Sequence, residues 1–421
     1  MKVLIFAHAP PPFHGQSYVV QLILAGFGGD RRKSGLGAGK MPGDIDCYHV
    51  DVRVSRSLED IGRMRLGKVA RLLGCCFEAI WVRFRYGVEN FYYIPAPGKR
   101  SAVYRDWLVM LLCRPFFKRL VLHWEAAGLG RWLDDPAQGQ LRRITCGVLK
   151  HADVSIVLSE YNRYDAEKVD SRQIRIVHNG IPDPCPDFEK TVLPRRLARL
   201  EARRRLLQGQ PQQQVQSEAT GKDPHLFRLL FLGHCTREKG LFDALSGLAM
   251  VNERLAREKS PIRVHLTVAG EFADAKERSE FERIAGGNPL LAYAGFVGGD
   301  TKTRLLVESD CLCFPTFHYA ESFGIVLIEA MAFGLSIVAA RWRAVPELFP
   351  PGYPGLVEIQ SPGQIAEALI GFVDTDSSRA LREIFLQRFT VEKFLSGLAE
   401  AFHQVEGPAR CDEDEEASFQ L

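Results

Sequence analysis

The chain of 421 residues has few cysteines for its length, and they lack the spacing of metal ligands or disulfide partners. Its ten cysteines include no Cys-x-x-Cys pair, and the nearest clusters are Cys75 with Cys76 and Cys311 with Cys313. So dilute a set excludes a disulfide scaffold and favours buried free thiols in a reducing compartment. We therefore expect a cytoplasmic protein without a zinc site.

Runs of apolar residues that could anchor the chain in a membrane are also missing. The apolar start, residues 2–7, is too short for a signal peptide and leads into prolines. Residues 323–340 are almost continuously apolar, but Glu329 lies at their middle, and Gly324 and Gly334 interrupt them. This pattern predicts a buried helix followed by a buried strand. No Gly-x-Gly-x-x-Gly follows the first expected strand, which disfavours a dinucleotide-dependent oxidoreductase.

The composition is that of an ordinary globular protein of two or three domains, with 46% hydrophobic and 25% charged residues. Residues 1–180 carry 27 Lys and Arg against 17 Asp and Glu, whereas the remainder carries 27 against 34. A basic half joined to an acidic half suggests that one half meets an anionic partner. Nucleic acid, anionic lipid and phosphorylated substrates are the candidates, and a solvated surface is the alternative.

Short apolar segments alternate with helix-like segments, which predicts parallel α/β layers. After a first strand at 2–7, we expect a helix from about Tyr18 with Ser17 as its N-cap. Residues 61–84 predict an amphipathic helix, and its expected apolar face contains Ile61, Val69, Leu72, Leu73, Cys76, Phe77 and Ile80. We expect a first domain at 1–182, a partly flexible linker at 183–227, a second domain at 228–390, a helix at 391–406 that crosses back to the first domain, and a disordered acidic tail at 407–421.

The strongest signal is the segment Pro315–Gly334, in which Glu321 and Glu329 lie eight residues apart around an expected helix start. Eight residues are about 2.2 helical turns, so helical phase alone does not pair them. Glu321 is expected in the loop after a strand, and Glu329 inside the helix that follows. The backbone N–H groups of Phe323–Val326 would then suit a phosphate. The alternative for Glu321 is a structural role, as a negative charge favoured by the helix dipole at a helix N-terminus. The alternative for Glu329 is a buried carboxyl group whose hydrogen-bond partners lie within the protein core.

Further motifs follow in an order that resembles a known family. They are Ile176-Val-His-Asn-Gly-Ile181, Gly233-His-Cys-Thr-Arg-Glu-Lys-Gly240, Gly270-Glu271, Gly295-Phe296-Val297 and Val345-Pro346-Glu347. With Glu-x7-Glu and Glu-Ala-Met-Ala-x-Gly, the chain resembles the retaining GT-B glycosyltransferases of family 4, the glycosyltransferases group 1. The resemblance spans nearly the whole chain and is strong from 228 to 348. It implies an α/β fold of two Rossmann-like, doubly wound parallel-sheet domains that face a cleft.

The resemblance implies a role for each matching residue. Glu329 resembles the glutamate that binds the ribose hydroxyls, Glu321 the glutamate beside the transferred sugar, and Lys239 the lysine on the donor diphosphate. His123 resembles a histidine over the donor sugar. The alternatives are a satisfied buried histidine and, for Lys239, a solvated surface lysine. The catalytic set is Glu321, His123 and Lys239; the donor-binding set is Gly15, Gln16, Gly233, Arg237, Lys239, Phe296, Val297, Ser322, Phe323, Gly324, Ile325 and Glu329.

One position departs from the family pattern. His234 stands where the family usually has arginine, and a neutral histidine cannot form the forked contact of arginine with a diphosphate. Arg237, three residues on, is the expected replacement. In the N-terminal half, the loop 10–17 occupies the position of the family's glycine-rich loop. Backbone N–H groups at Gly15 and Gln16 could approach a phosphate or sugar there, and a plain turn is the alternative.

The resemblance implies a hexosyltransferase-type, retaining enzyme that moves a sugar from a nucleotide-diphosphate sugar to a saccharide or lipid-linked acceptor, in cell-surface polysaccharide or glycolipid synthesis. It implies a front-face displacement in which the leaving phosphate helps to remove the acceptor's proton. Asp44-Ile-Asp46 and Asp374-Thr-Asp376 have the Asp-x-Asp pattern of the metal motif in the other major glycosyltransferase fold, but both lie in polar loops without that fold's context. We therefore expect no metal and no cofactor. A catalytically weak GT-B-like nucleotide-sugar-binding protein is the alternative.

The basic N-terminal half predicts contact with an anionic membrane surface, and we expect no nucleic-acid partner. Residues 51–120 carry 14 Lys and Arg against 6 Asp and Glu. The expected helix starts with a basic cluster and ends in aromatic residues, a combination that suits lipid headgroups. These residues are Arg63, Arg65, Lys68 and Arg71, then Trp81, Phe84 and Tyr86. We expect a cytoplasmic protein, peripheral on the inner face of the membrane; a core-packed helix with a solvated basic face is the alternative.

Overall fold

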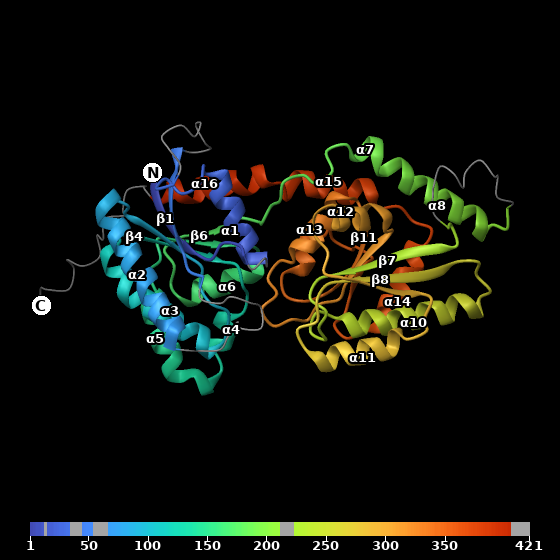
Figure 1. Ribbon diagram of the computed structural model, residues 1–421, viewed down its shortest axis with the longest axis horizontal. Helices are drawn as coiled ribbons and strands as arrows, with labels where there is room; N and C mark the ends of the chain where they lie inside the picture. Colours follow the sequence, from blue (N-terminus) through green and yellow to red (C-terminus); the bar gives the residue numbers. More distant parts are fainter. Residues whose placement is uncertain (12–14, 34–43, 54–65, 211–222, 406–421) are drawn as a thin grey trace, which may run out of the picture.

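The computed structural model describes residues 1–11, 15–33, 44–53, 66–210 and 223–405, which form two α/β domains. Each domain is built on a six-stranded sheet with parallel pairing between neighbouring strands. Figure 1 shows the domains side by side, the first coloured blue to green and the second yellow to orange. Among the described residues, no helix is long and apolar enough to cross a membrane.

The N-terminal sheet has the strand order β2-β1-β3-β4-β5-β6. Most of its strands are short apolar runs, because parallel strands are covered by helices on both faces. The strands are β1 (Lys2–Ala7), β2 (Asp46–Asp51), β3 (Asn90–Tyr93), β4 (Arg119–Trp124), β5 (Val154–Val157) and β6 (Ile174–Ile176). The helices are α1 (Gly15–Gly26), α2 (Leu66–Tyr86), α3 (Arg100–Cys113), α4 (Leu129–Leu133), α5 (Gly139–Leu149) and α6 (Glu160–Lys168), with 3-10 turns η3 (Arg114–Phe116) and η4 (Pro136–Gln138).

The C-terminal sheet has the strand order β12-β11-β10-β7-β8-β9. Its strands are β7 (Leu226–Leu232), β8 (Arg263–Ala269), β9 (Leu291–Gly295), β10 (Cys311–Phe314), β11 (Ser336–Ala340) and β12 (Leu356–Val357). The helices around it are α10 (Leu241–Arg257), α11 (Ala275–Ala285), α12 (Gly299–Glu308), α13 (Ile325–Ala332), α14 (Pro362–Phe372) and α15 (Ser378–Arg388), with the 3-10 turn η5 (Val345–Leu348). The apolar stretch 323–340 therefore contains a buried helix and a buried strand, α13 and β11, as its sequence predicts.

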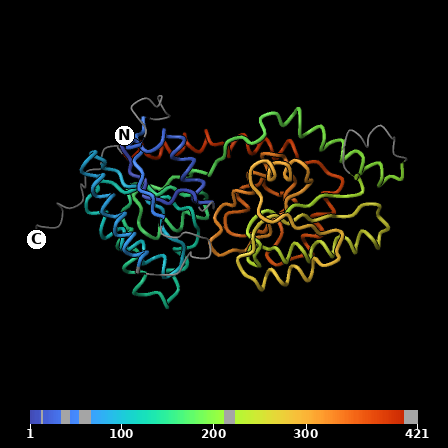
Figure 2. The backbone as a smooth tube through the Cα atoms, viewed as in Figure 1, coloured from blue at the N-terminus to red at the C-terminus, as the bar shows by residue number. Residues whose placement is uncertain are grey.

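The last helix, α16 (Val391–Gln404), packs on the N-terminal sheet. Its apolar face joins the core that lies beneath β1 and β5, and the ring of Phe402 lies 5.9 Å from that of Phe27 and 6.0 Å from that of Tyr92. The chain thus passes between the domains twice, once after β6 and once before α16 (Figure 2). Because of the second crossing, β1 and α16 both belong to the N-terminal domain.

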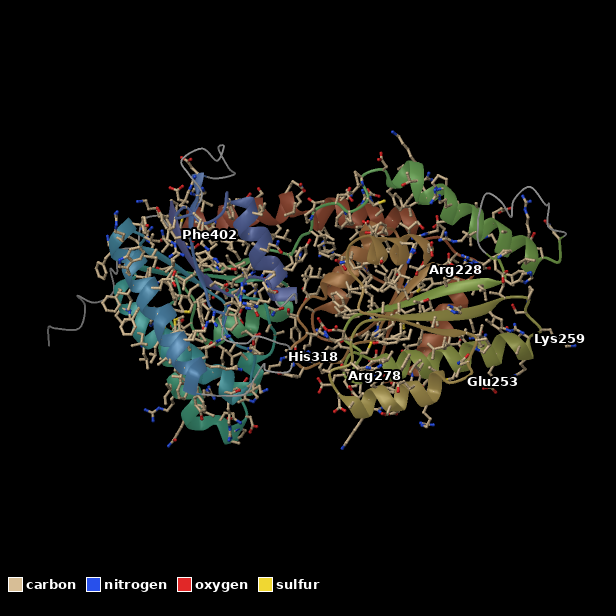
Figure 3. All side chains as sticks on the ribbon, viewed as in Figure 1. Arg228, Glu253, Lys259, Arg278, His318 and Phe402 are labelled. Atoms are coloured by element: carbon tan, nitrogen blue, oxygen red, sulfur yellow. The ribbon has the colours of Figure 1, made fainter. Side chains whose placement is uncertain are left out.

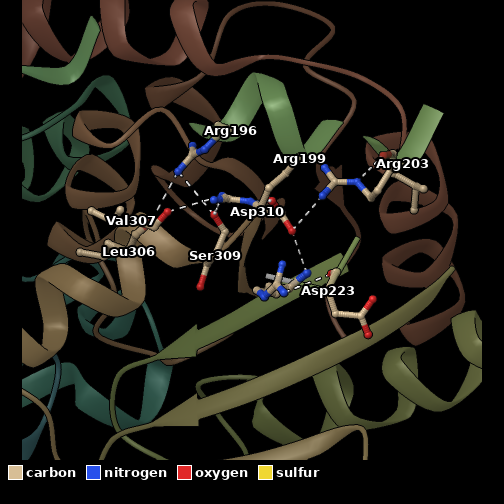
Figure 4. Close-up of polar contacts among 10 residues, drawn as sticks. Arg196, Arg199, Arg203, Asp223, Leu306, Val307, Ser309 and Asp310 are labelled. Carbon is tan, nitrogen blue, oxygen red and sulfur yellow. Dashed lines mark hydrogen bonds and ion pairs between the residues drawn. The ribbon is translucent and has the colours of Figure 1, made fainter. Parts of the chain in front are cut away.

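Two helices, α7 (Phe188–Thr191) and α8 (Leu193–Leu207), lie within the stretch that the sequence marks as a linker. Helix α7 packs on the C-terminal domain through Phe188, and α8 packs on it with three buried arginines, Arg196, Arg199 and Arg203. Figure 4 shows these side chains around Asp310, at the start of β10. Arg199 Nε lies 3.0 Å from Asp310 Oδ1 and Arg203 Nη1 lies 3.1 Å from Oδ2. Burial opposes ionisation of Asp310, but the two arginines keep its pKa below the ordinary value.

Two local expectations are wrong. Helix α1 begins at Gly15, and Ser17 is a buried residue inside it rather than the N-cap. Phe77 of α2 is 67% exposed, because the face that packs on the sheet has a different phase, given by Leu72, Cys75, Cys76, Ala79 and Val82. Ile61, Arg63, Arg65, the linker stretch 211–222 and the tail 407–421 lie outside the described residues. The nine cysteines that the structure describes are free thiols, and all but Cys146 are buried.

Candidate functional site

The carboxyl ends of the strands of the two sheets face each other across the domain interface. The Glu347 carboxylate, after β11, accepts hydrogen bonds from the backbone N–H groups of Glu160 and Tyr161 at the start of α6, at 2.8 and 2.9 Å. Arg343 Nη1 donates to the Ala127 carbonyl at 2.7 Å. Loops that follow β4, β5 and β11 therefore meet, which is where ligands bind in open α/β sheets.

Lys239 and Glu321 form an ion pair at this interface. Lys239 Nζ lies 2.5 Å from Glu321 Oε2, and Thr316 Oγ1 donates to the same oxygen at 3.2 Å. The two side chains are 18% and 9% exposed. A Cβ on Gly240 would lie 2.2 Å from the Pro315 carbonyl oxygen, so only glycine lets the Lys239 loop pack against the end of β10. The structure thus brings together two of the three expected catalytic residues.

Glu329, inside α13, is held by a lysine that the sequence analysis did not single out. Lys302 Nζ of α12 lies 2.6 Å from Glu329 Oε1. Tyr18 of α1, in the other domain, packs against the core of the C-terminal domain, and burial together with the charge of Glu329 raises the pKa of its hydroxyl. The expected ribose-binding residue therefore lies at the domain interface with one oxygen fixed by a cation.

Two helix N-termini meet close to these pairs. A Cβ added to Gly15, the first residue of α1, would lie 3.8 Å from Ile325 Cδ1, at the start of α13. Gly324 precedes α13 in the left-handed conformation, with φ 76°. Ser322 Oγ donates to the Glu125 carbonyl, and Phe323 is buried against the rings of His178 and Phe389. The positive ends of two helix dipoles thus point into one region, which favours an anion.

His123 lies deeper, in β4, and is fully buried. Its Nδ1 lies 2.5 Å from the Tyr92 hydroxyl and its Nε2 lies 3.3 Å from Glu125 Oε1. Burial lowers the pKa of His123 to about 3, so its imidazole is neutral. Burial also raises the pKa of Glu125 to about 7, although Asn179 Nδ2 donates to its Oε2 at 3.1 Å. His123, Glu125 and Asn179 form a buried polar group beneath Ser322.

Arg237 and Lys239 have different partners in the free protein. Its guanidinium donates to Glu280 Oε2 at 2.7 Å and lies 4.4 Å from the centre of the Phe242 ring, while its backbone N–H donates to Glu277. The physical reason is that Glu277 and Glu280 lie on the facing helix α11 and attract the arginine. In the free protein Arg237 is thus paired with α11, and its contact with the donor diphosphate stays a prediction. Partial burial and Lys239 lower the pKa of His234, so this residue is neutral at pH 7.

The remaining expected donor residues lie directly after strands β7 and β9 of the C-terminal domain. Gly233 follows β7 directly. After β9, Phe296 is 68% exposed and Val297 is 9% exposed. His318, labelled in Figure 3, lies on the Glu321 loop where the domains meet. Burial, with Lys239 nearby, lowers the pKa of His318 to about 4. Across the described residues, no three His, Cys, Asp or Glu side chains are grouped as metal ligands would be.

Residues 227–375 match the family model described as glycosyl transferases group 1. Among curated proteins, the chain is 32% identical to a phosphatidyl-myo-inositol mannosyltransferase of Mycolicibacterium smegmatis, over 36% of this chain and 37% of that one. It is 29% identical to a D-inositol 3-phosphate glycosyltransferase of Pseudarthrobacter chlorophenolicus, over 32% of each chain. The match thus spans about a third of the length of these relatives.

Solved structures resemble the whole chain. Anabaena HepE in complex with UDP and glucose has a TM-score of 0.59 and 16% identity, covering 96% of this chain and 99% of that one. Sucrose-phosphate synthase from Thermosynechococcus elongatus has a TM-score of 0.63 and 15% identity, with the same coverage. The fold is GT-B. The two-domain, parallel-sheet fold predicted from the sequence is confirmed.

Proposed function

We propose that this protein is a retaining, hexosyl-type glycosyltransferase that uses a nucleotide-diphosphate sugar. The observation that carries the proposal is the meeting of Lys239, Glu321 and the N-termini of α1 and α13 at one domain interface. A cation and two helix N-termini suit a diphosphate, whose negative charge increases as it leaves. The match of residues 227–375 to the glycosyl transferases group 1 supports the same reading.

The donor would lie across both domains. Lys239 and the backbone N–H groups at Gly15, Gln16, Gly324 and Ile325 would bind the diphosphate. The Glu329 carboxylate would accept hydrogen bonds from ribose hydroxyls, with Lys302 holding one of its oxygens in place. Glu321 would lie beside the transferred sugar, where its negative charge stabilises positive charge developing at the anomeric carbon.

The proposed reaction is a front-face displacement that needs no protein nucleophile, metal or cofactor. The bond between the anomeric carbon and the phosphate oxygen breaks while the acceptor oxygen bonds to the same face of that carbon. The acceptor's proton passes to the leaving phosphate oxygen, so charge and atoms balance. His123 is neutral and fully buried in the free protein, so any contact between it and the sugar requires the domain interface to rearrange.

The proposed acceptor is a saccharide or lipid-linked compound, in cell-surface polysaccharide or glycolipid synthesis. Two relatives are named for inositol compounds, phosphatidyl-myo-inositol and D-inositol 3-phosphate, and these names support an acceptor rich in hydroxyl groups. We further propose a cytoplasmic protein that is peripheral on the inner face of the membrane. The basic N-terminal half, opposite an acidic C-terminal half, supports this location.

A donor screen tests the proposal. The full chain is incubated with UDP-, GDP- and ADP-hexoses, and nucleoside diphosphate release is followed together with the anomeric configuration of any product. We expect slow hydrolysis of one donor, faster release with an acceptor, and retained configuration. Binding without turnover would instead favour the catalytically weak nucleotide-sugar-binding protein, for which the neutral His234 is the supporting observation.

A matched pair of variants keeps the screen specific. Glu321→Gln should abolish most turnover, whereas Glu282→Gln on α11, exposed and paired with Arg278, should leave it unchanged. An inverted product would contradict the retaining reaction, and equal loss in both variants would contradict the role of Glu321.

A further inference from the structure

Helix α2 carries a second apolar face, directed away from the sheet. Leu72, Cys75, Cys76, Ala79 and Val82 cover the sheet and are buried. On the other side, Phe77, Trp81 and Phe84 are 67%, 53% and 67% exposed. Their spacing of four and three residues puts them within an arc of about 60° on an ideal helix. Three large side chains so exposed on one stripe are unusual for a surface that contacts only water.

Helix α3 and turn η3 extend this surface. Cys113 Sγ of α3 contacts the Cys76 carbonyl at 3.9 Å, so the end of α3 lies beside α2. The rings of Phe84 and Phe116 are edge to face, with centres 6.0 Å apart. Phe116 is 41% exposed, and Leu111 of α3 is 64% exposed. We call Phe77, Trp81, Phe84, Leu111 and Phe116 the apolar stripe; α2 and α3 lie next to each other in Figure 1.

Basic residues are in excess on helix α2, which carries most of the apolar stripe. Helix α2 contains Lys68, Arg71, Arg83 and Arg85 but a single acidic residue, Glu78. Glu78 is already paired with Arg32, at 2.7 Å, and the nearby Glu89 with Lys118, at 2.8 Å. Arg71 and Arg85 are exposed, and the Arg85 guanidinium lies 5.4 Å from the centre of the Tyr86 ring. Glu78 and Glu89 are thus both paired with cations, so the net charge around the apolar stripe is positive.

We propose that the apolar stripe and its flanking arginines dock on an anionic lipid bilayer. Aromatic and aliphatic side chains would enter the headgroup region, while arginines at their edge pair with lipid phosphates. Because α2 is not among helices able to cross a membrane, it would lie along the surface. The acidic second half of the chain, with 27 Lys and Arg against 34 Asp and Glu, would be repelled from the same surface. Charge therefore also sets which domain faces the lipid.

Vesicle binding of the full chain tests this inference. Vesicles of phosphatidylcholine with phosphatidylglycerol are compared with vesicles of phosphatidylcholine alone, at low salt and at about 0.1 M salt, where charge screening acts over about 10 Å. We expect sedimentation with the anionic vesicles only, weakening as salt rises. Trp81 fluorescence should shift to the blue, and brominated lipids should quench it. Trp81→Phe should keep binding and lose most of this signal.

Matched variants identify the surface. Trp81→Ser should weaken partition about tenfold, the lower end for burial of a large apolar side chain. Arg85→Ser should weaken it about fivefold, since each basic residue near the surface contributes that much. Leu386→Ser and Arg257→Ser, exposed residues of the C-terminal domain, should change nothing. All these side chains are exposed, so melting temperatures should stay unchanged.

Three results would overturn the inference. They are the absence of binding at low salt, equal binding by the α2 and control variants, and self-association that Trp81→Ser dissolves while vesicles bind neither protein. The last result would assign the apolar stripe to a second copy of the chain. The assay contains no sugar donor, so its failure is distinct from failure of the proposed glycosyl transfer.

Discussion

Glu321 and Glu329 each hold a lysine in the free protein, yet their replacement should have different kinetic effects. Glu321 is beside the proposed reacting carbon, so Glu321→Gln should lower kcat about 100-fold or more, equal to roughly 3 kcal/mol of transition-state stabilisation. Affinity for the bare nucleoside diphosphate should stay the same or rise slightly, since Lys239 loses a competing partner. Steady-state kinetics and calorimetric titration measure the two quantities. Normal turnover in Glu321→Gln would show that the sugar lies elsewhere.

Glu329→Gln provides the contrast. A carboxylate that binds ribose contributes equally in the ground and transition states, so its loss should raise KM for the donor with little change in kcat. The bare nucleotide should be weakened by the same factor. If both glutamates were structural, both variants would lose melting temperature and activity together.

Lys239 should act on the diphosphate alone. Removing one charge-assisted contact costs roughly 1.5–3 kcal/mol. Lys239→Ala should therefore weaken nucleoside diphosphate binding by about 10- to 150-fold, while affinity for the nucleoside changes little. Lys276→Ala, an exposed lysine of α11, is the control. Equal loss for both ligands would mean that Lys239 acts through the fold.

The carboxyl of Glu125 should make stability depend on pH. Its pKa is 4.5 ordinarily and about 7 in the folded protein, because burial disfavours the charged form. Between pH 4.5 and 7 the folded state binds more protons at Glu125 than the unfolded state does. The contribution of Glu125 to the free energy of unfolding is therefore fully present below pH 4.5 and is lost as pH rises towards 7. Relative to Glu125→Gln, the melting temperature of the native chain should therefore fall over this range. A difference independent of pH would contradict the raised pKa.

His123 has the opposite pH dependence. Burial lowers the pKa of His123 from 6.5 to about 3. The contribution of His123 to the free energy of unfolding is therefore fully present above pH 6.5 and is lost as pH falls towards 3. Both proteins in the Glu125 comparison contain His123, so the pH-dependent difference between them reports the Glu125 carboxyl together with its contact to His123. Glu125 itself could have been suspected from sequence, because it follows His123 by two residues at the end of an expected strand.

Individual contacts were the part of the site that sequence could not supply. The Glu-x7-Glu segment pointed to Glu321 and Glu329, but Lys302 lies 27 residues before Glu329 on another helix and belongs to no motif. Arg237 fits the spacing of a diphosphate ligand, yet the position of Glu280 on α11 decides its direction. Such pairings depend on how helices pack, which residue spacing does not encode.

At the level of elements, helix α8 depends on Asp310. Removing one partner of a buried ion pair costs about 3–5 kcal/mol, because the remaining charges are left without compensation. Asp310→Asn should destabilise the protein by this amount in urea unfolding, since Arg199 and Arg203 remain buried. The exposed Asp374→Asn should stay within about 0.5 kcal/mol of the native chain. A small effect of Asp310→Asn would mean that water solvates the arginines.

The same elements show which patterns sequence could and could not resolve. Strand positions in both sheets were predictable, because parallel strands covered on both faces read as apolar runs. The arginine-rich stretch of α8 looked like a polar linker, yet three of its arginines are buried, and two of these pair with Asp310, which is distant in sequence. In α2, apolar residues occupy two faces, so periodicity alone could not tell that Phe77 is exposed.

At the level of the whole molecule, the proposed site exists only when the domains meet. Gly15 and Tyr18 come from the first domain, and Lys239, Glu321 and Glu329 come from the second. Donor affinity and domain arrangement should therefore be coupled, because a ligand that contacts both domains favours the arrangement that brings them together.

Glu347 offers a way to test this coupling away from the ligand. Its carboxylate caps α6 of the other domain, and a charge at an exposed helix N-terminus contributes up to ~1 kcal/mol. Glu347→Ala should favour a more open arrangement, seen as a larger radius of gyration in small-angle scattering. It should also weaken nucleoside diphosphate binding by up to about fivefold, and saturating nucleotide should restore the compact scattering curve. Glu358→Ala, exposed beside Arg341 in the same domain, is the control. Identical scattering from native and Glu347→Ala chains, with unchanged affinity, would show that donor binding does not depend on this contact.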